Sequence, residues 1–380
     1  MRFISIFLFT FLFIVSAKAD IISEVLEEFA INNTKANRDS VINIQKSITQ
    51  DDIRDFKSTL KSKPNNAYIV KREIEKIDAP KFLMFLAMTE SRFTNFATSD
   101  KKAAGMWQFM PKTAKAFGLD INAHVDERRD PFLSTDTAFA YIATLNGMFD
   151  NKWYLSLMAY NCGDGCMRKT IKNLGTNDFS ALLNSSITPK ETKGFIKKII
   201  KYTIISKTPH IESVLVNLEP NVEIEKIKVD GGTKLSSVAK SIGVPVEDMK
   251  TYNPHIKQGV APSTNETYHF YIPEDKLNLY ALNYIGKLIR GEKELDKRFE
   301  IHRVAKDETL KDIADKWSVK VADIKELNGL KSDKVVVGYE LKIPLTNLAL
   351  NDNKKYSIGS ASKTKKFDFR KGNIVALSDL

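Results

Sequence analysis

Glu90 is the residue whose type and position most directly suggest catalysis. It stands at the C-terminal end of an apolar run, 82–88, that is hydrophobic on every side of a helix, which predicts an element buried inside its domain. Desolvation raises the pKa of a carboxyl group, and the partial negative charge at a helix C-terminus acts in the same direction. The position therefore predicts a general acid at neutral pH. The alternative is a structural carboxylate that pairs with Arg92 or Lys101.

Two further segments carry groups that suit a saccharide cleft. Residues 105–111 read Gly-Met-Trp-Gln-Phe-Met-Pro and place a flexible backbone position, an indole and an amide just before a helix. Residues 159–163 read Ala-Tyr-Asn-Cys-Gly and add a phenol and an amide after the apolar helix 153–158. Aromatic faces and planar amides are suited to binding sugars. The alternative for Trp107 and Phe109 is that they fill the core, as most aromatic side chains do.

Helices are expected to position these groups. A helical period dominates from 68 to about 206, and long alternation of β-branched residues is absent. Asp78 and Pro80 predict the start of the helix that carries the apolar run, and Pro111 predicts the start of another. These signals favour a mainly α domain over 66–210. A polar, weakly patterned N-terminal extension, short helical or loose, is expected before it over 20–65.

The C-terminal half contains a repeat with a spacing of 75 residues. The matching positions are Leu235, Val238, Ala239, Val244, Val246, Asp248, Met249, Tyr252 and Asn253 with Leu310, Ile313, Ala314, Val319, Val321, Asp323, Ile324, Leu327 and Asn328. In each copy a strand-like stretch precedes two short amphipathic helices, and a second strand ends in Ile-Pro. The pattern predicts small α+β modules of order βααβ at 222–273 and 299–345, joined by a charged helix over 275–298. Thr309 and Asp312 predict a capping box in the second copy.

Composition limits the classes of function. The 380 residues are 43% hydrophobic and 28% charged, which excludes a wholly disordered chain and favours two or three folded units. A formal net charge of +11 suits an anionic partner, which could be nucleic acid, anionic lipid or an acidic wall polymer. Two cysteines exclude a disulfide-built scaffold and a multi-cysteine zinc array. The five histidines are scattered along the sequence and are predicted to be structural.

The first 19 residues of the chain indicate export. Residues 1–19 have the charged, apolar and small-residue order of a cleavable secretory signal peptide. The alternative, an uncleaved anchor, needs a longer apolar run of roughly 20 residues. No cysteine follows the cleavage site, so a lipoprotein is not expected, and no later segment is apolar enough to predict an integral membrane segment in the mature chain. The expected location is the periplasm or cell envelope, either free there or peripheral to a membrane. The tail 346–380 is expected to be basic and flexible, which suits contact with an anionic surface.

The two cysteines, Cys162 and Cys166, form a C-x3-C pair beside the third motif. Three interpretations compete, namely a short-range disulfide in an oxidising compartment, two free thiols or a metal site. A disulfide that closes so short a loop can be strained, so the disulfide and the two free thiols are given equal weight. The metal interpretation is the weakest of the three.

In their order and spacing, Glu90-Ser91, 105–111 and 159–163 resemble the three motifs of lytic transglycosylase domains of the soluble type, which have a lysozyme-like fold. The segment 126–135, which begins Asp-Glu-Arg-Arg-Asp-Pro, and the two repeats narrow the resemblance to the D-type, membrane-bound branch of that family. The repeats resemble LysM modules; the second copy matches well and the first looks degenerate. The expected fold class is therefore a multidomain chain, in which a mainly α lysozyme-like catalytic domain precedes small LysM-like modules.

The resemblance implies a peptidoglycan lyase that cleaves the MurNAc-β-1,4-GlcNAc bond without water and leaves 1,6-anhydro-MurNAc ends. It implies that Glu90 is the single acid and base, and that the N-acetyl group of the sugar stabilises the developing cation. The implied substrate-binding residues are Ser91, Gly105, Met106, Trp107, Gln108, Phe109, Tyr160, Asn161 and Phe195. The implied partner is the glycan strand of peptidoglycan, with no nucleic acid, no metal and no other cofactor; protein partners are not indicated.

Phe195 departs from the family pattern, because the family usually carries a tyrosine in a late helix near the acid. Loss of the hydroxyl removes one polar contact, and Tyr202, two turns further on, is the weaker substitute. Two other functions stay open. One is a hydrolytic muramidase, which needs a second group to activate water. The other is a non-catalytic peptidoglycan-binding or scaffold protein, which the departure at Phe195 and the degenerate first repeat favour.

Overall fold

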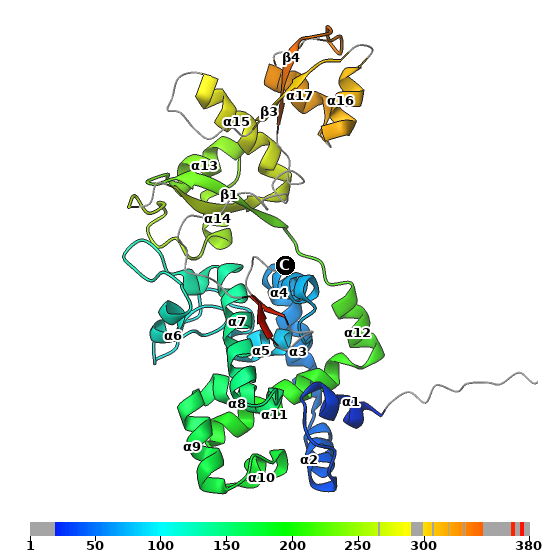
Figure 1. Cartoon of the computed structure of the whole chain (residues 1–380), viewed down its shortest axis with the longest axis vertical. Helices are drawn as coiled ribbons and strands as arrows, with labels where there is room; N and C mark the ends of the chain where they lie inside the picture. Colours follow the sequence, from blue (N-terminus) through cyan, green and yellow to red (C-terminus); the bar gives the residue numbers. More distant parts are fainter. Residues whose placement is uncertain are drawn as a thin grey trace, which may run out of the picture. The chain divides into compact units, whose positions relative to one another are not determined.

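The structure is a computed structural model that describes residues 20–264, 267–289, 299–305, 308–317, 319–328, 330, 332–344, 366–368 and 373–375. The predicted signal peptide lies outside the described residues, as do the end of the predicted linker helix and most of the predicted tail. The chain divides into two compact units, one formed by Met1–Ile53 with Met148–Leu215 and the other by Arg54–Gly147 with Val216–Leu380. Helices make up the chain as far as α12, and small two-stranded ladders follow (Figure 1).

The first unit is entirely helical over its described residues. Its helices are α1 (Ile21–Glu28), α2 (Lys35–Lys46), the start of α3 (Gln50–Ser62), α8 (Trp153–Cys162), α9 (Asp164–Leu174), α10 (Phe179–Asn184), α11 (Lys190–Ser206) and most of α12 (Pro209–Val216). Helix α11 packs against α1, α2 and α8 through buried isoleucines. The side chain of Asn37 in α2 donates to Asp178 Oδ2 at 2.9 Å and accepts from the Ser180 amide at 2.9 Å. The first two helices are thus part of this core.

The second unit begins with the helices that carry the candidate acid. They are the remainder of α3, α4 (Pro64–Ile77), α5 (Leu83–Ser91), α6 (Pro111–Ala116), the 3-10 turn η1 (Glu127–Arg129) and α7 (Leu133–Met148). Residues 83–88 are buried on every side of α5, as the apolar run predicts. Pro111 opens α6 as expected. The prediction for Asp78 was wrong, since this residue ends α4 in the left-handed conformation, φ 53°, and α5 begins only at Leu83.

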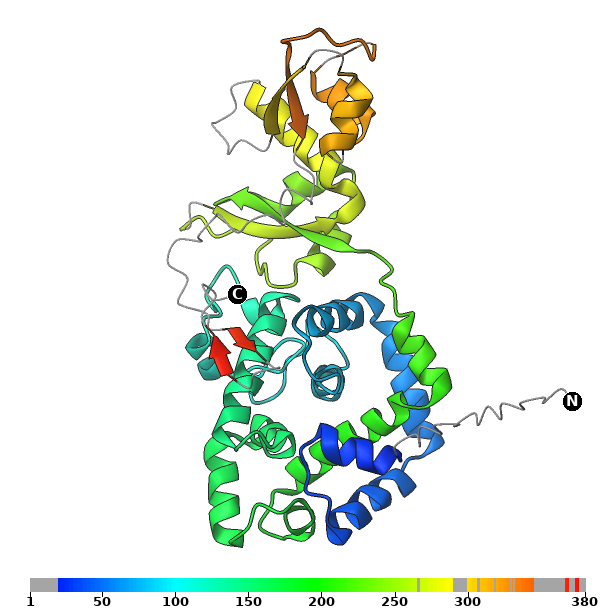
Figure 2. The same cartoon turned by 45° about the vertical axis from the view of Figure 1, so that its right-hand side comes forward.

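Both repeats fold as βααβ modules, each with its own apolar core. The first contains β1 (Ile224–Asp230), α13 (Leu235–Ile242), α14 (Val246–Tyr252) and β2 (Thr267–Pro273), and the second contains β3 (Phe299–Arg303), α16 (Leu310–Trp317), α17 (Val321–Asn328) and β4 (Glu340–Pro344). The strands of each pair are antiparallel (Figure 2). Ile224 lies opposite Pro273 in the first pair, and Phe299 lies opposite Pro344 in the second. The predicted capping box in the second module is confirmed, because Thr309 and Asp312 exchange backbone-to-side-chain hydrogen bonds.

Between the modules, η2 (Glu274–Lys276) leads into α15 (Leu277–Ile289), where one charged helix was expected. In the tail, β5 (Lys366–Asp368) pairs antiparallel with β6 (Asn373–Val375), a ladder that the polar sequence did not predict. No helix among the described residues has the length and apolar character needed to cross a membrane. The predicted fold class, a helical lysozyme-like domain followed by small α+β modules, is confirmed.

The repeat extends to its hydrogen bonds. The Asn253 amide donates to the carbonyl four residues earlier at 2.9 Å and to the Tyr271 carbonyl at 2.8 Å, and it accepts from the Tyr271 amide at 2.7 Å. Asn328 makes the same three contacts, at 2.8 Å to the carbonyl four residues earlier and at 2.7 and 2.8 Å to the backbone of Lys342. Each asparagine therefore joins the second helix of its module to the last strand.

We expect Asn253→Leu to weaken the first module, because it leaves the buried backbone N–H and C=O of Tyr271 without their side-chain partner. An unsatisfied buried group costs about 1–3 kcal/mol. A loss of about 2 kcal/mol speeds amide exchange of the β2 segment by roughly 30-fold, which hydrogen exchange with mass spectrometry measures. Thr251→Ala, which removes an exposed hydroxyl in the same module, is the control. Equal exchange in both variants would contradict the assigned role.

Candidate active site

Glu90 lies in the last turn of α5, where the helix leaves the interior of the second unit. The residues before it, 83–88, are buried, whereas Glu90 itself is half-buried. The helix ends at Arg92, whose φ of 55° turns the chain away. A carboxyl group in this position is partly removed from water and is still within reach of solvent or of a ligand. Partial removal from water helps a general acid to hold its proton, and access to a ligand allows it to deliver that proton.

Ser91 connects the first two predicted motifs. Its hydroxyl donates a hydrogen bond to the Met106 carbonyl at 2.7 Å and accepts one from the Thr94 amide at 3.0 Å. The end of α5 is thereby fixed to the segment that carries Gly105 and Met106. The structure thus brings the predicted acid and the 105–111 segment together, as expected for parts of one site. Contact of Ser91 with a substrate stays a prediction.

The 105–111 segment turns tightly at Gly105, which has a φ of 82°. A Cβ added there would lie 1.7 Å from the Arg128 carbonyl oxygen, so the backbone approach allows only glycine. Gln108 also has a positive φ, 47°, and its amide nitrogen donates to the Gly105 carbonyl at 2.8 Å. Its side chain is half-buried. The turn therefore fixes the position of the amide that the motif predicts as a substrate ligand.

The apolar members of this segment are part of the core. Met106, Trp107 and Phe109 are all buried. The Trp107 indole donates a hydrogen bond to Thr135 Oγ1 at 3.0 Å and meets the ring of Phe139 edge-on, with 5.7 Å between the ring centroids. The structure thus favours the alternative in which Trp107 and Phe109 fill the core. Trp107 and Phe109 therefore hold the turn in place from within the core. Their direct contact with a substrate stays a prediction.

Arg128 is a positioning residue for which the sequence pattern predicted no role. Its guanidinium makes two hydrogen bonds of 2.8 Å to the Asp126 carboxylate. It also donates to the carbonyls of Lys102, at 2.7 Å, and Phe109, at 3.1 Å. Arg128 and Asp126 are both buried. Because Arg128 binds the carbonyls of Lys102 and Phe109, it holds both ends of the turn around Gly105. The acceptors lie 26 and 19 residues earlier in the chain, so no local pattern could have revealed this role.

The other candidates belong to the first unit. Tyr160 and Asn161 lie in the last turn of α8 and are half-buried. The side-chain Oδ1 atom of Asn161 accepts a hydrogen bond of 2.7 Å from the hydroxyl of Thr192. Thr192 is a buried residue of α11 for which the sequence pattern predicted no role. Phe195, on the same helix, is 9% exposed. Tyr202 is enclosed in the core of this unit, which does not favour it as a substitute for the missing hydroxyl.

The two cysteines of this unit are free thiols in the structure. Burial and the neighbouring Cys166 raise the pKa of Cys162 to about 12. The Cys162 thiol is therefore protonated at neutral pH and is a poor nucleophile. Formation of a disulfide in an oxidising compartment stays a prediction.

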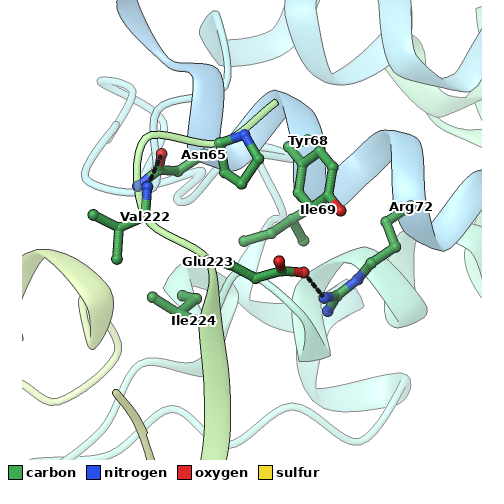
Figure 3. A pocket seen from close by; sticks show the side chains of 8 residues that line it. Asn65, Tyr68, Ile69, Arg72, Val222, Glu223 and Ile224 are labelled. Carbon is green, nitrogen blue, oxygen red and sulfur yellow. Dashed lines mark hydrogen bonds and ion pairs between the residues drawn. The ribbon is translucent and has the colours of Figure 1, made fainter. Parts of the chain in front are cut away.

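A pocket of the second unit lies elsewhere, between α4 and the start of β1 (Figure 3). Arg72 and Glu223 form an ion pair of 3.2 Å beside it, and Asn65 accepts a hydrogen bond of 2.7 Å from the Asn221 amide. None of the predicted substrate-binding residues lines it. The contacts tie the first module to α4, so we assign this region a structural role.

The structure also brings together residues that are far apart in the sequence. Asp130, which begins the turn before α7, is fully buried and lies against His255, His269 and Tyr271. Burial alone would raise the pKa of Asp130, but the two histidines and several hydrogen bonds outweigh it and hold that pKa well below its usual value. The histidines, scattered along the sequence, were predicted to be structural. Two of them meet at one buried carboxylate, 125 and 139 residues from it along the chain.

Comparison with known families gives three matches. Residues 67–183 match the Transglycosylase SLT domain, residues 223–284 match the family described as Lytic transglycosylase MltD, LysM-like domain, and residues 302–344 match the LysM domain. Glu90 and the 105–111 and 159–163 segments all fall in the first match. The resemblance drawn from the motifs is therefore confirmed.

Individual proteins are also similar to parts of this chain. Membrane-bound lytic murein transglycosylase D of Escherichia coli K12 is 28% identical over 293 residues, which are 75% of this chain and 64% of that protein. The chain thus spans less than two thirds of this relative. The peptidoglycan transglycosylase gp16 of phage T7 is 41% identical over 81 residues, 21% of this chain and 6% of gp16. Among solved structures, the 70-kDa soluble lytic transglycosylase of E. coli is 25% identical with a TM-score of 0.31, over 36% of this chain and 23% of that chain.

Proposed function

We propose that this chain is a peptidoglycan lytic transglycosylase that cleaves the MurNAc-β-1,4-GlcNAc bond without water. The observation that carries the proposal is the placement of Glu90 in the last turn of a buried helix, joined through the Ser91 hydroxyl to the 105–111 segment. Both lie in the part of the chain that matches the Transglycosylase SLT domain. The names of the homologues support the same substrate class.

In the proposed mechanism a single carboxyl group serves twice. Glu90, protonated, gives its proton to the glycosidic oxygen as the bond to C1 breaks, and the N-acetyl group of the sugar stabilises the developing cation. Glu90, now ionised, removes the proton from the C6 hydroxyl as that oxygen closes on C1. The C6 oxygen of the sugar replaces the leaving oxygen at C1 and Glu90 recovers its proton, so the step consumes no water. Gln108, Tyr160 and Asn161 are the proposed polar contacts to the substrate.

The modules are proposed to hold the enzyme on its polymeric substrate. Tethering raises the effective concentration of glycan at the catalytic domain even where each module binds weakly. The net charge of +11 adds attraction to the peptide carboxylates of the wall. We infer export through a cleavable signal peptide over 1–19 and a location in the periplasm or cell envelope. The proposed domain limits are 66–210 for the catalytic domain, with modules at 222–273 and 299–345.

The products released from purified sacculi test this proposal. Mass spectrometry should find muropeptides one water lighter than the reducing forms. Reducing ends would instead support a hydrolytic muramidase. Retention on sacculi without release of products would support a non-catalytic wall-binding protein. Retention on DNA at moderate salt would contradict the proposed choice of partner, since binding through charge alone weakens steeply with salt.

A single substitution tests the departure at Phe195. If the missing hydroxyl costs one transition-state contact, Phe195→Tyr should raise the rate of muropeptide release by up to about tenfold, since a net hydrogen bond is worth about 0.5–1.5 kcal/mol. Phe96→Tyr, at a side chain that is 56% exposed, should leave the rate unchanged. An unchanged rate in a folded Phe195→Tyr variant would mean that this position makes no polar contact in the reaction.

A further inference from the structure

We propose that Asp130, His255 and His269 form a binding site for a divalent transition-metal ion, and that Zn²⁺ best suits this ligand set. One potential ligand atom from each residue lies within 4.8 Å of the other two. The Asp130 Oδ2 atom is 2.8 Å from His269 Nε2 and 3.6 Å from His255 Nε2. Zinc held tetrahedrally by bonds of about 2.0–2.1 Å separates its ligand atoms by roughly 3.3 Å. Small movements would therefore bring the three groups onto one ion.

His255 supplies the second observation. Its side chain is fully buried, and among the described residues neither ring nitrogen has a hydrogen-bond partner. The ring stacks on that of His269, with 5.0 Å between centroids and 17° between planes. A buried polar group without a partner costs about 1–3 kcal/mol, so it is rare and needs an explanation. A metal ion bound at Nε2 provides a partner for one of these two nitrogens.

The hydrogen bonds of Asp130 orient it for this role. Its Oδ1 atom accepts from the Tyr271 hydroxyl at 2.9 Å, from the Phe132 amide at 3.0 Å and from the Leu133 amide at 2.9 Å. Oδ2 is the atom that faces the two histidines. Outer hydrogen bonds that fix one oxygen and leave the other to the metal are characteristic of carboxylate ligands.

The ion would link two parts of the second unit. Asp130 belongs to the segment that matches the Transglycosylase SLT domain, and both histidines belong to the first module. Asp130 and His255 are fully buried and His269 is 12% exposed, so a large substrate has no access to the ligands. We therefore assign the ion a structural role, as a clamp that fixes the first module to the catalytic domain. The inference does not depend on the proposed function.

Direct titration tests the site. Purified, tag-free protein carrying Cys162→Ser and Cys166→Ser, to remove the thiols as ligands, is stripped of metal and titrated with Zn²⁺ by calorimetry. We expect one tight site per chain. His255→Gln and His269→Gln should each weaken Zn²⁺ binding by at least about 100-fold, since removing even an outer hydrogen-bond partner costs roughly 10–100-fold. His210→Gln, at an exposed histidine, should leave binding unchanged.

Two readouts guard against misfolded variants. The first uses the protein with all three proposed ligands intact, so no substitution at the site can disturb its fold. Co²⁺ added in place of Zn²⁺ should give this protein the visible absorption of an ion bound by nitrogen and oxygen atoms. Zn²⁺ should also raise the melting temperature of that protein and not that of His255→Gln. Absence of a stoichiometric site would overturn the proposal. So would tight binding that survives both histidine substitutions.

Discussion

Replacing Glu90 by glutamine should lower the rate of muropeptide release from purified sacculi by about 10²–10⁴-fold. Glutamine has nearly the same size and can accept or donate a hydrogen bond, but it can neither deliver a proton to the glycosidic oxygen nor remove one from the C6 hydroxyl. The half-buried position at the end of α5 accommodates the substitution, so the fold should be unchanged. Binding to sacculi should also be unchanged, because the proposed tether lies in the modules.

The matched control is Glu75→Gln, which makes the same change at an exposed position of α4. Its rate should equal that of the unaltered protein. The role of Glu90 as acid and base would be refuted if the Glu90→Gln variant kept more than a tenth of the control's rate of muropeptide release. This holds provided that its circular dichroism and its binding to sacculi match those of the control. Loss of both release and binding would instead point to a damaged fold, which the dichroism spectrum would reveal.

Gly105→Ala should strongly destabilise the second unit. The added Cβ would lie 1.7 Å from the Arg128 carbonyl oxygen and 2.6 Å from its carbon, and both are backbone atoms that cannot rotate away. The φ of 82° is itself strained for alanine. Overpacking of about 1–3 kcal/mol and left-handed strain of about 1–2 kcal/mol together predict a loss of about 2–5 kcal/mol. Thermal and denaturant unfolding measure this loss.

We also expect Gly105→Ala to lose most of its activity, because the 105–111 segment must move away from Arg128 and disturb the Ser91 contact with Met106. Gly147→Ala is the matched control. This glycine lies near the end of α7, and an added Cβ would meet nothing within 4 Å. Alanine favours a helix interior by roughly 0.5–1 kcal/mol over glycine, so this variant should be as stable or slightly more stable. Similar stability of both variants would contradict the close approach at Gly105.

Local sequence patterns predicted the features that depend on periodicity. The apolar run before Glu90 predicted a buried helix because no face of it is polar, and α5 is buried from 83 to 88. The spacing of 75 residues predicted two modules of one design, and in the structure the matched residues Asn253 and Asn328 make equivalent contacts. These features depend on hydrophobic burial along one helix or within one βααβ unit. A local sequence pattern is therefore enough to predict them.

What sequence could not supply are contacts between distant segments. Residue type alone also misplaced one helix boundary. Asp78 fits a helix start, but it adopts the left-handed conformation and ends the preceding helix. Arg128 gains its role from carbonyls of the turn that it supports. The cluster of Asp130 with His255 and His269 depends on how the first module packs on the catalytic segment. No pattern within a window of ten or twenty residues carries that information.

The central claim is that the glycosidic bond is cleaved without water, and oxygen-18 tests it most directly. Sacculi are digested in water enriched in oxygen-18, and the released muropeptides are separated and weighed at once. If Glu90 directs the C6 hydroxyl onto C1, the new ends carry no label and have the mass of the 1,6-anhydro form. One heavy oxygen at each new reducing end would show that water attacked C1. That result would contradict the account and leave a hydrolase on the same fold.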